Sequence, residues 1–484
     1  MTLSMLHPVL PEALLVGLSL LLLLVGVYGN SKKSYTIVNL FALLGSIFII
    51  MMMGAVAPSD LEHTIINNMY ISNPFTQLFK ILILISAIIA GLLSYSWLPI
   101  NANGNGRSEY SILLMLASVG LMLVISSNNF LALYVGLELA SLSMYVMASY
   151  NRDSTYSTEA GMKYFILGSL ASGMLLYGIS LIYGFSGTID FSALSSIFQS
   201  NQEINIGLML GMIFVLIAFC FKISAVPFHM WTPDVYEGTP TAVVTYFATA
   251  PKITFLALLA RLSAEMFIHI SHTTEQIIVT VCAASMIIGA VGALAQQNIK
   301  RILAFSSISH VGYMLLAITS NSARGIESLY MYMVIYMAMS FGVFSVLMLL
   351  KSNSKEITDI YQLKGLSQSH PTIAALLSIT MFSMAGIPPF IGFFAKMFVF
   401  TAALQADYIL LVVIAAISSV VACFYYIRIV KIMYFDSQTI APDAVNKNTI
   451  AWIILWSSVL ANIFLVTPSL VLSPAKEAAR VLFP

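Results

Sequence analysis

Seven ionisable side chains of this 484-residue chain stand inside long apolar runs, where charge is costly. They are five lysines, one acid and one histidine: Lys80, Lys163, Lys222, Lys252, Lys396, Glu138 and His310. A charge at the centre of a bilayer costs about 2.5–3.5 kcal/mol on insertion scales, so each residue needs a partner, water or a function. A buried lysine or a histidine can exchange a proton near neutral pH. The group therefore has the composition of a proton relay.

Glu138, in "GLELASLSMY", is the one acid near the middle of an apolar run. Its short side chain cannot reach the headgroups, and the hydroxyls of Ser141 and Ser143 could hydrogen-bond it. We expect Glu138 to be a charged member of the relay. The alternative is a structural role, as a paired buried ion or as a protonated acid.

Two of the lysines stand close to a proline. Lys222 precedes Pro227 by five residues, and Lys252 directly follows Pro251. Proline interrupts the hydrogen bonds of a helix. In a membrane the freed carbonyl groups must be satisfied by protein or by water in a cavity. We expect a helix break that admits water beside Lys222 and a broken backbone hydrogen-bond ladder at Lys252, and for each the alternative is a structural kink with a paired lysine.

For the remaining candidates, a role outside the relay is a stronger alternative. Lys80 stands about one turn into its run, so we expect it to extend towards the headgroups. Lys163 is also near the start of a run, and headgroup contact and relay function are equally open for it. His310, in "SSISHVGYM", is either a relay residue or a hydrogen-bonded core histidine.

The composition indicates the elements that must hold these residues. The chain is 59% hydrophobic and 8% charged, whereas soluble domains carry about 25% charged residues. We predict an all-α polytopic membrane protein, a single integral-membrane domain over residues 1–484, with about 14 spans. The predicted spans are 9–28, 35–57, 75–98, 108–126, 129–149, 159–184, 205–229, 239–262, 274–295, 301–320, 324–350, 372–404, 408–435 and 449–472.

Two of these spans are irregular, and they stand at matching places in the chain. The span 205–229 carries Lys222, and the span 372–404 is interrupted by "GIPPF" at 386–390 before Lys396. Each is the fourth of five consecutive spans. Because five is odd, the second set must enter the membrane from the opposite side. This predicts two inverted repeats, 108–264 and 274–435, with a transport site at their interrupted helices.

The distribution of basic residues and the spacing of the cysteines bear on orientation and on possible functions. Twelve Lys and Arg residues fall in the loops of one side and four in the loops of the other, so we expect both termini on the side opposite the cytoplasm. The net charge of +1 gives no support to nucleic-acid binding. The three cysteines lack metal-like spacing, and neither a nucleotide-binding loop nor a cluster motif is present. We expect no redox chemistry within this chain.

Four motifs carry a family resemblance. They are "VPFHMWTPDVYEGTPT" with the later "APK", "GLELASLSMY", "QQNIKRILAFSSISHVGYM" and "MAGIPPFIGFFAK". With these motifs in the family's order, nearly the whole chain resembles the antiporter-like membrane subunits of respiratory complex I, the NADH–quinone oxidoreductase. The resemblance implies 14 helices in two inverted repeats and one proton pathway.

The resemblance also implies a role for each candidate. Glu138 would be the acid, Lys163 its partner, Lys222 the lysine of the broken helix, Lys252 the connecting lysine, His310 part of the central polar axis and Lys396 the exit-side lysine. The chain itself would hold no cofactor and no metal, while NADH, FMN, iron–sulfur clusters and quinone would be bound by partner subunits. The implied location is the bacterial inner membrane.

Two other functions are compatible with the residues. The chain could be a subunit of a multi-subunit cation/proton antiporter, which has no redox partner. It could also be a structural subunit whose charges only hold helices together. Co-purification with flavin and iron–sulfur subunits would separate the first of these from complex I.

Overall fold

The computed structural model describes residues 8–28, 32–55, 63–94, 109–199, 205–267, 272–352, 355–437, 449–464 and 469–483. Apart from two short hairpins, the regular structure of these residues is helical. Eleven of the described helices are long and apolar enough to cross a membrane, and shorter apolar helices accompany them. The prediction of an all-α polytopic membrane protein is confirmed. The count of 14 spans and the inverted repeats stay predictions.

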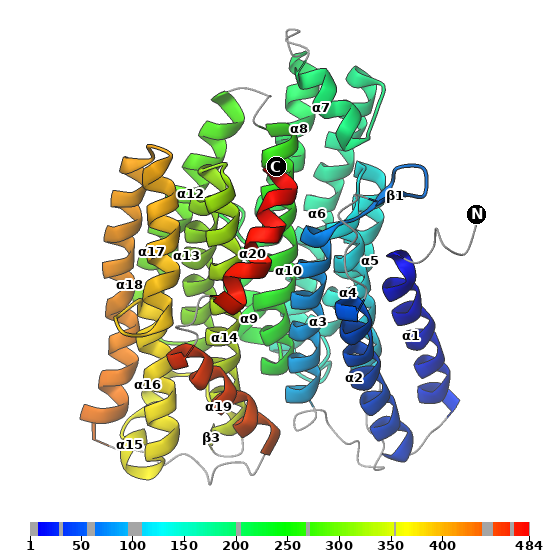
Figure 1. Ribbon diagram of the computed structural model, residues 1–484. Helices are drawn as coiled ribbons and strands as arrows, with labels where there is room; N and C mark the ends of the chain where they lie inside the picture. The colour runs from blue at the N-terminus through cyan, green and yellow to red at the C-terminus, as the bar shows by residue number, and fades with distance from the viewer. Residues whose placement is uncertain are drawn as a thin grey trace. The chain divides into compact units, whose positions relative to one another are not determined.

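The chain divides into two compact units, and each is described by itself. The first comprises Met1–Ile223, Ala250–Thr274 and Arg480–Pro484. Its elements, drawn from blue to green in Figure 1, are α1 (Leu10–Tyr28), α2 (Lys32–Ala55), β1 (His63–Ile65), β2 (Tyr70–Ser72), α3 (Pro74–Ser94), α4 (Glu109–Ser126), α5 (Phe130–Ala148), α6 (Thr155–Ser186), α7 (Phe191–Gln199) and α8 (Ile206–Ile223). The second half of α10 (Thr241–Leu262) and the π-helical turn η2 (Ser263–Phe267) complete this unit.

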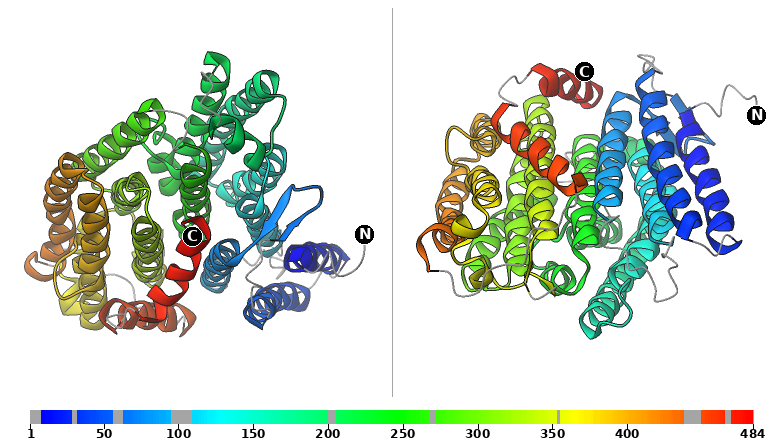
Figure 2. Two further views of the ribbon diagram at one scale, coloured as in Figure 1. Left: turned by 45° about the horizontal axis from the view of Figure 1, so that its top comes forward. Right: turned by 90° about the horizontal axis from the view of Figure 1, so that it is seen from below.

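Two pairs of helices in the first unit pack with their backbones in close contact. α4 packs along α5, and α6 packs along α8 (Figure 2). A Cβ atom added at Gly120 on α4 would lie 2.5 Å from the backbone nitrogen of Ala140 on α5, and one added at Gly178 on α6 would lie 2.7 Å from the carbonyl oxygen of Gly211 on α8. Small residues at such crossings are how membrane helices pack without a hydrophobic driving force.

The second unit comprises Ser224–Thr249 and Glu275–Ala479. Its elements are α9 (Trp231–Gly238), the first half of α10, most of α12 (His272–Leu294), α13 (Ile299–Thr319), α14 (Ala323–Leu349), β3 (Lys351–Ser352), β4 (Lys355–Glu356), η3 (Ile360–Leu363), α15 (Leu366–Ser369), α16 (Pro371–Ala385), α17 (Ile391–Gln405), α18 (Ile409–Phe435), α19 (Thr449–Phe464) and most of α20 (Ser469–Leu482). α13 and α14 are its buried centre, and α14 packs against α16, α17 and α19.

Both irregular spans are interrupted in the structure. α16 ends at Ala385 and α17 begins at Ile391, so the break predicted at 386–390 is confirmed. The span 205–229, the other one predicted to be interrupted, is also broken, because α8 stops at Ile223. Ser224 adopts a φ of 64°, which a helix cannot contain. The chain resumes as the short helix α9.

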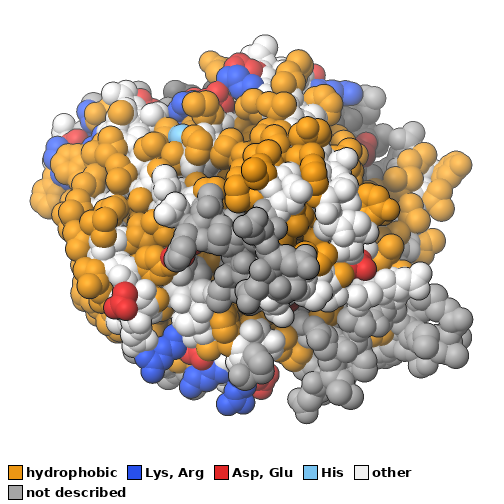
Figure 3. Space-filling model, turned by 90° about the horizontal axis from the view of Figure 1, so that it is seen from above, with side chains coloured by type: hydrophobic (Ala, Val, Ile, Leu, Met, Phe, Trp, Pro, Cys, Tyr) orange, Lys and Arg blue, Asp and Glu red, His pale blue; other side chains and the backbone are white. Residues whose placement is uncertain are grey.

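The outer faces of the helices are apolar. Large hydrophobic side chains are exposed along α1, α2, α6 and α18, including Tyr28, Met51, Leu170 and Val420. Hydrophobic side chains also prevail over charged ones on the face drawn in Figure 3. A soluble protein rarely exposes so much contiguous apolar surface, and lipid is the environment in which these faces are stable.

Candidate functional site

Lys222 lies in the last turn of α8 and is almost completely buried. Its ammonium donates a hydrogen bond to Ser141 Oγ at 2.7 Å and lies 3.5 Å from the hydroxyl of Tyr145. Ser141 and Tyr145 are four residues apart on α5, so they share one face of that helix. Both groups that hold the ammonium are neutral.

Glu138 stands on the same face of α5, three residues before Ser141. It acts electrostatically on Lys222 and on Tyr145, and its Oε1 atom is buried without a hydrogen-bond partner. The serines predicted to bind it do not, because Ser141 accepts from Lys222 and Ser143 donates to the carbonyl of Leu139. Acid and ammonium are therefore neighbours that make no direct ion pair among the described residues.

Lys163 pairs with an acid of its own helix, and this pair leaves both headgroup contact and relay function open for it. Its ammonium lies 2.7 Å from Glu159 Oε1, one turn earlier on α6, and the two side chains are 42% and 60% exposed. The spacing of four residues within one helix explains this choice, since it brings the two side chains together without any tertiary contact.

Lys252 lies within α10, directly after Pro251, and is 2% exposed. The helix continues through the proline, although the ring removes one backbone hydrogen bond. On the same helix, Thr254 donates its hydroxyl to the carbonyl of Ala250. The break expected at this lysine is therefore a local loss of one backbone donor and not an interruption.

Lys396 lies on α17, beyond the break, and its side chain reaches back across it. The ammonium donates to the carbonyl of Ala385 at 2.9 Å and to Ser419 Oγ on α18 at 2.8 Å, and it lies 5.2 Å from the centre of the Tyr313 ring. Ala385 is the last residue of α16. The ammonium thus occupies the negative, carbonyl end of a helix that stops within its span.

The backbone around this break is closely fitted. Ser383 Oγ accepts from the amide of Gly392 at 3.2 Å, which satisfies one free donor at the start of α17, and donates to Asn462 Oδ1 at 2.6 Å. A Cβ atom at Gly392 would lie 1.8 Å from the carbonyl oxygen of Ser383. Only glycine fits there, so the second half-helix starts against the end of the first.

His310 on α13 is buried, and hydroxyl groups engage both of its ring nitrogens. Nδ1 lies 2.7 Å from the Tyr332 hydroxyl, and Nε2 lies 3.2 Å from that of Tyr426. Tyr426 also forms a short hydrogen bond with Ser306. Sequence reasoning identified the histidine but missed these hydroxyls. The signal that could have found Ser306 is its four-residue spacing from His310 within an apolar run.

The expectation for Lys80 was wrong. The side chain does not reach towards headgroups, because its ammonium is fully buried against Glu12 Oε1 and the Tyr70 hydroxyl, both at 2.6 Å. Burial raises the pKa of Tyr70 to about 12, so its hydroxyl stays protonated and donates to Glu12. Lys80 is a paired lysine that joins α3 to α1.

A charged cluster holds the segment after the first break against α13. Arg301 Nη1 lies 2.7 Å from Asp234 Oδ1 and 2.8 Å from Glu237 Oε2, and both acids belong to α9. The neighbouring Lys300 lies 2.9 Å from Glu356 Oε2. The motifs "TPDVYEG" and "NIKR" are therefore partners in space.

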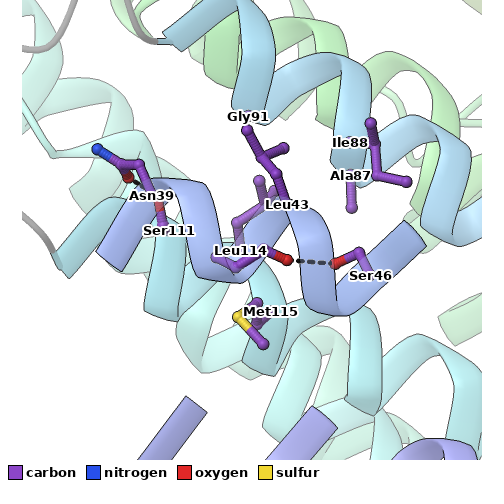
Figure 4. A pocket seen from close by; sticks show the side chains of 10 residues that line it. Asn39, Leu43, Ser46, Ala87, Ile88, Gly91, Ser111, Leu114 and Met115 are labelled. Atoms are coloured by element: carbon purple, nitrogen blue, oxygen red, sulfur yellow. Dashed lines mark hydrogen bonds between the residues drawn. The ribbon is translucent and has the colours of Figure 1, made fainter. Parts of the chain in front are cut away.

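The described ranges hold small cavities and no candidate metal site. No group of three or more His, Cys, Asp or Glu residues there could hold a metal ion. A cavity of about 20 Å³ lies between α2, α3 and α4, large enough for one water. As Figure 4 shows, Asn39 and Ser111 line it at one end and Ser46 at the other.

Comparison with known proteins places this arrangement in a family. Residues 127–424 match the family model described as NADH:quinone oxidoreductase/Mrp antiporter, TM. The chain is 43% identical over 477 residues to subunit N of the NADH-quinone oxidoreductase of Rhodospirillum rubrum, covering 99% of this chain and 97% of that protein. The subunit of the same name from Paramagnetospirillum magneticum is 41% identical. The chain belongs to the NADH-quinone oxidoreductase subunit N family.

Solved structures agree with that assignment. A chain of respiratory complex I from Thermus thermophilus is 27% identical, with a TM-score of 0.80 and coverage of 96% of this chain and 98% of that one. An archaeal membrane-bound sulfane sulfur reductase and an Mrp complex from Dietzia share the fold, with TM-scores of 0.84 and 0.80 at 21% and 19% identity. The resemblance inferred from the four motifs is confirmed. The motifs "HMWTPDVYEG" and "APK" resemble the N-type subunit, and the lysine at 396 fits the N or the L type.

Proposed function

We propose that this chain is the proton-translocating N subunit of a bacterial complex I. The relay residues would be Glu138, Lys163, Lys222, Lys252, His310 and Lys396. The observation that carries the proposal is the setting of Lys222 and Lys396. Each is a buried ammonium near the carbonyl end of an interrupted helix, and each is held by neutral oxygen atoms.

Lys80 differs from these two lysines in the charge of its partner. Its ammonium lies against the carboxylate of Glu12, so removing its proton would leave a buried negative charge. Removing a proton from Lys222 or Lys396 leaves a neutral amine among hydroxyl and carbonyl groups. The charge state of these two lysines can therefore change at a smaller cost, which a relay requires.

Glu138 supplies the means of control. It lies close enough to Lys222 to act on it electrostatically without a direct bond, so a change in the charge at Glu138 alters the free energy of the ammonium. Electron transfer from NADH to quinone, through FMN and iron–sulfur clusters in partner subunits, would drive that change. Protons would then pass along the lysines, while this chain performs no redox chemistry.

The proposed setting is the bacterial inner membrane. Neighbouring antiporter-like and small membrane subunits and the peripheral redox arm would be the partners. The twelve-to-four distribution of basic residues supports a cytoplasmic position for the Lys/Arg-rich loops and a periplasmic position for both termini. The two repeats, 108–264 and 274–435, would each contribute one interrupted helix.

The alternative is a subunit of a cation/proton antiporter, since the matching family model covers both classes. The identity of 43% to an N subunit, against 19% to a chain of the Mrp complex, favours complex I. Affinity purification of the tagged chain discriminates between the two. Co-purification with flavin and iron–sulfur proteins supports complex I, and their consistent absence supports the antiporter.

Two substitutions at Lys222 test the relay in the assembled complex. Lys222→Met removes the proton carrier, and Lys222→Arg keeps a charge that cannot be released. We expect both to lower proton pumping about 100-fold or more, the scale of a lost acid–base group. Lys431→Met, at an exposed lysine near the end of α18, is the control. Wild-type pumping per NADH in both Lys222 variants would refute the relay.

A further inference from the structure

A polar path lies within the second unit, and the relay lysines are not part of it. Ser306 and His310 stand one turn apart on α13, and Tyr426 on α18 bonds to both of them. On the far side of the imidazole, Tyr332 on α14 completes a chain of four hydrogen-bonding groups. All four side chains are at most 2% exposed.

One end of this chain opens into a cavity. The cavity has a volume of about 10 Å³, and Ser306 is one of its walls. Tyr236, Tyr336 and Ser340 also line it. Tyr336 and Ser340 continue on α14 the four-residue spacing that begins at Tyr332, so the three share a face of that helix.

The size and lining of the cavity fit one water molecule. About 10–15 Å³ of free volume is the least that holds a water, which also needs two to four polar partners. The four hydroxyl-bearing residues in the lining can supply them. A buried site of this kind, at membrane depth and next to a hydrogen-bonded chain, is more stable hydrated than empty.

We propose that this cavity is a water site and that Tyr426 is the relay hydroxyl between it and His310. The inference rests on the proposed proton translocation and adds an entry to its central histidine. Tyr236 belongs to α9, the segment that follows the interruption of the first broken span. Through Tyr236, the position of that segment determines the shape of the water site.

The proton steps balance. An excess proton on the water passes to Ser306, the proton of Ser306 passes to Tyr426, and the proton of Tyr426 passes to Nε2 of His310. The histidine becomes an imidazolium that donates from both ring nitrogens, to Tyr332 and to Tyr426. Each hydroxyl receives one proton and releases one, so its composition is unchanged.

Tyr426→Phe tests the relay, because it removes one oxygen and keeps the ring. In proteoliposomes containing the whole complex, we expect the rate of NADH-driven proton uptake per assembled complex to fall about tenfold. We also expect a smaller solvent isotope effect in D₂O. Tyr434→Phe, at an exposed position on the same helix as Tyr426, is the matched control and keeps the wild-type rate. Should Tyr426→Phe fail to assemble, Ser306→Ala interrupts the same path.

Ser340→Val tests the water site by filling it. We expect a similar loss of proton uptake, and an experimental map of the wild-type complex should show one ordered water beside Ser306. Wild-type rates and isotope effects in Tyr426→Phe and Ser340→Val would overturn the inference. If Lys222→Met abolishes pumping while these variants do not affect it, the inference alone fails. If Lys222→Met has no effect, the proposed function fails.

Discussion

At the scale of single residues, the partner of a lysine determines what it can do. Lys80, Lys222 and Lys396 are all fully buried, and composition does not distinguish them. Lys80 has a carboxylate partner, whereas Lys222 and Lys396 have hydroxyl and carbonyl partners. The first arrangement fixes a charge and stabilises a helix contact. The second leaves the charge free to change, which is the property that proton transfer needs.

Gly386 is the residue whose replacement should disturb Lys396 most directly. It ends α16 with a φ of 82°, and a Cβ atom there would lie 3.0 Å from Cδ and Nζ of Lys396. We expect Gly386→Ala to cost about 1–2 kcal/mol for the left-handed backbone alone. Because the ammonium must also move, proton pumping per assembled complex should fall. The loss of stability is measured as the heat stability of the subunit in membranes, and the loss of pumping is measured as proton uptake.

Gly173→Ala is the control for that substitution. Gly173 is exposed on α6, and a Cβ atom there meets nothing within 4 Å. Alanine is favoured over glycine within a helix by about 1 kcal/mol. Unchanged pumping in Gly173→Ala and reduced pumping in Gly386→Ala is the expected result. Equal pumping in the two variants would contradict the role given to Gly386.

The sequence predicted which ionisable residues are buried better than it predicted their contacts. The burial of Lys222, His310 and Lys396 was predictable because an ionisable residue within an apolar run is visible in the sequence alone. The pairing of Lys80 with Glu12 was missed because it joins α1 to α3 across 68 positions. The pair between Lys163 and Glu159 was missed although its four-residue spacing is local. Tyr332 and Tyr426 were missed because tyrosine carries no charge and resembles an ordinary core residue.

At the scale of elements, helix ends within the spans carry most of the unusual chemistry. The break at 386–390 was predictable because "GIPP" combines a helix-ending glycine with two prolines. The earlier break was placed too late, since Pro227 suggested it while the turn begins at Ser224. The hairpin of β1 and β2 and the short α7 were not predicted, because apolar periodicity is too weak over so few residues.

The buried pair of Glu12 and Lys80 should behave as a clamp between two helices. Removing one partner of a buried ion pair typically costs about 3–5 kcal/mol, because the other charge is left unpaired. We therefore expect Lys80→Met to lower the amount of folded subunit strongly. The double variant Glu12→Gln with Lys80→Met should recover much of the loss. Immunoblots of the membrane fraction measure it, and a double variant no better than Lys80→Met would contradict the clamp.

Glu356 ties β4 to the starts of α10 and α13, and its contribution depends on pH. Burial alone would raise the pKa of the Glu356 carboxyl, but the ammonium of Lys300 and hydrogen bonds from Lys300 and Thr241 hold it below its ordinary value of about 4.5. A depressed pKa adds stability above that value, and the stability is lost as the pH falls below it.

Glu356→Gln should accordingly be less heat-stable than wild type at pH 7. Its deficit should shrink between about pH 4.5 and pH 3, because the wild-type carboxylate is then protonated. The soluble fraction of this subunit after heating the detergent-extracted complex is the measurement. A deficit that is constant over this pH range would show that the charge of Glu356 does not stabilise the fold.

At the scale of the whole molecule, the chain contains two interrupted spans, and each places a buried lysine beside its break. Lys222 lies before the break that follows α8, and Lys396 lies after the break between α16 and α17. The ammonium of Lys396 nevertheless contacts the carbonyl end of α16. An inverted repeat preserves the order of residues along the chain, so it would match the two broken helices but not the two lysines position for position. The repeats stay a prediction, because their equivalence depends on direction across the membrane.

The direction of the chain across the membrane is open to a direct test. Twelve basic loop residues on one side and four on the other predict that both termini face the periplasm. Alkaline phosphatase fused after Pro484 should be active, since it folds only outside the cytoplasm, and a fluorescent protein fused there should be dark. The loop at Lys364, from the basic set, is the matched control and should give the opposite pattern. A bright fluorescent fusion at Pro484 would reverse the orientation of every span and, with it, the side from which protons enter the proposed relay.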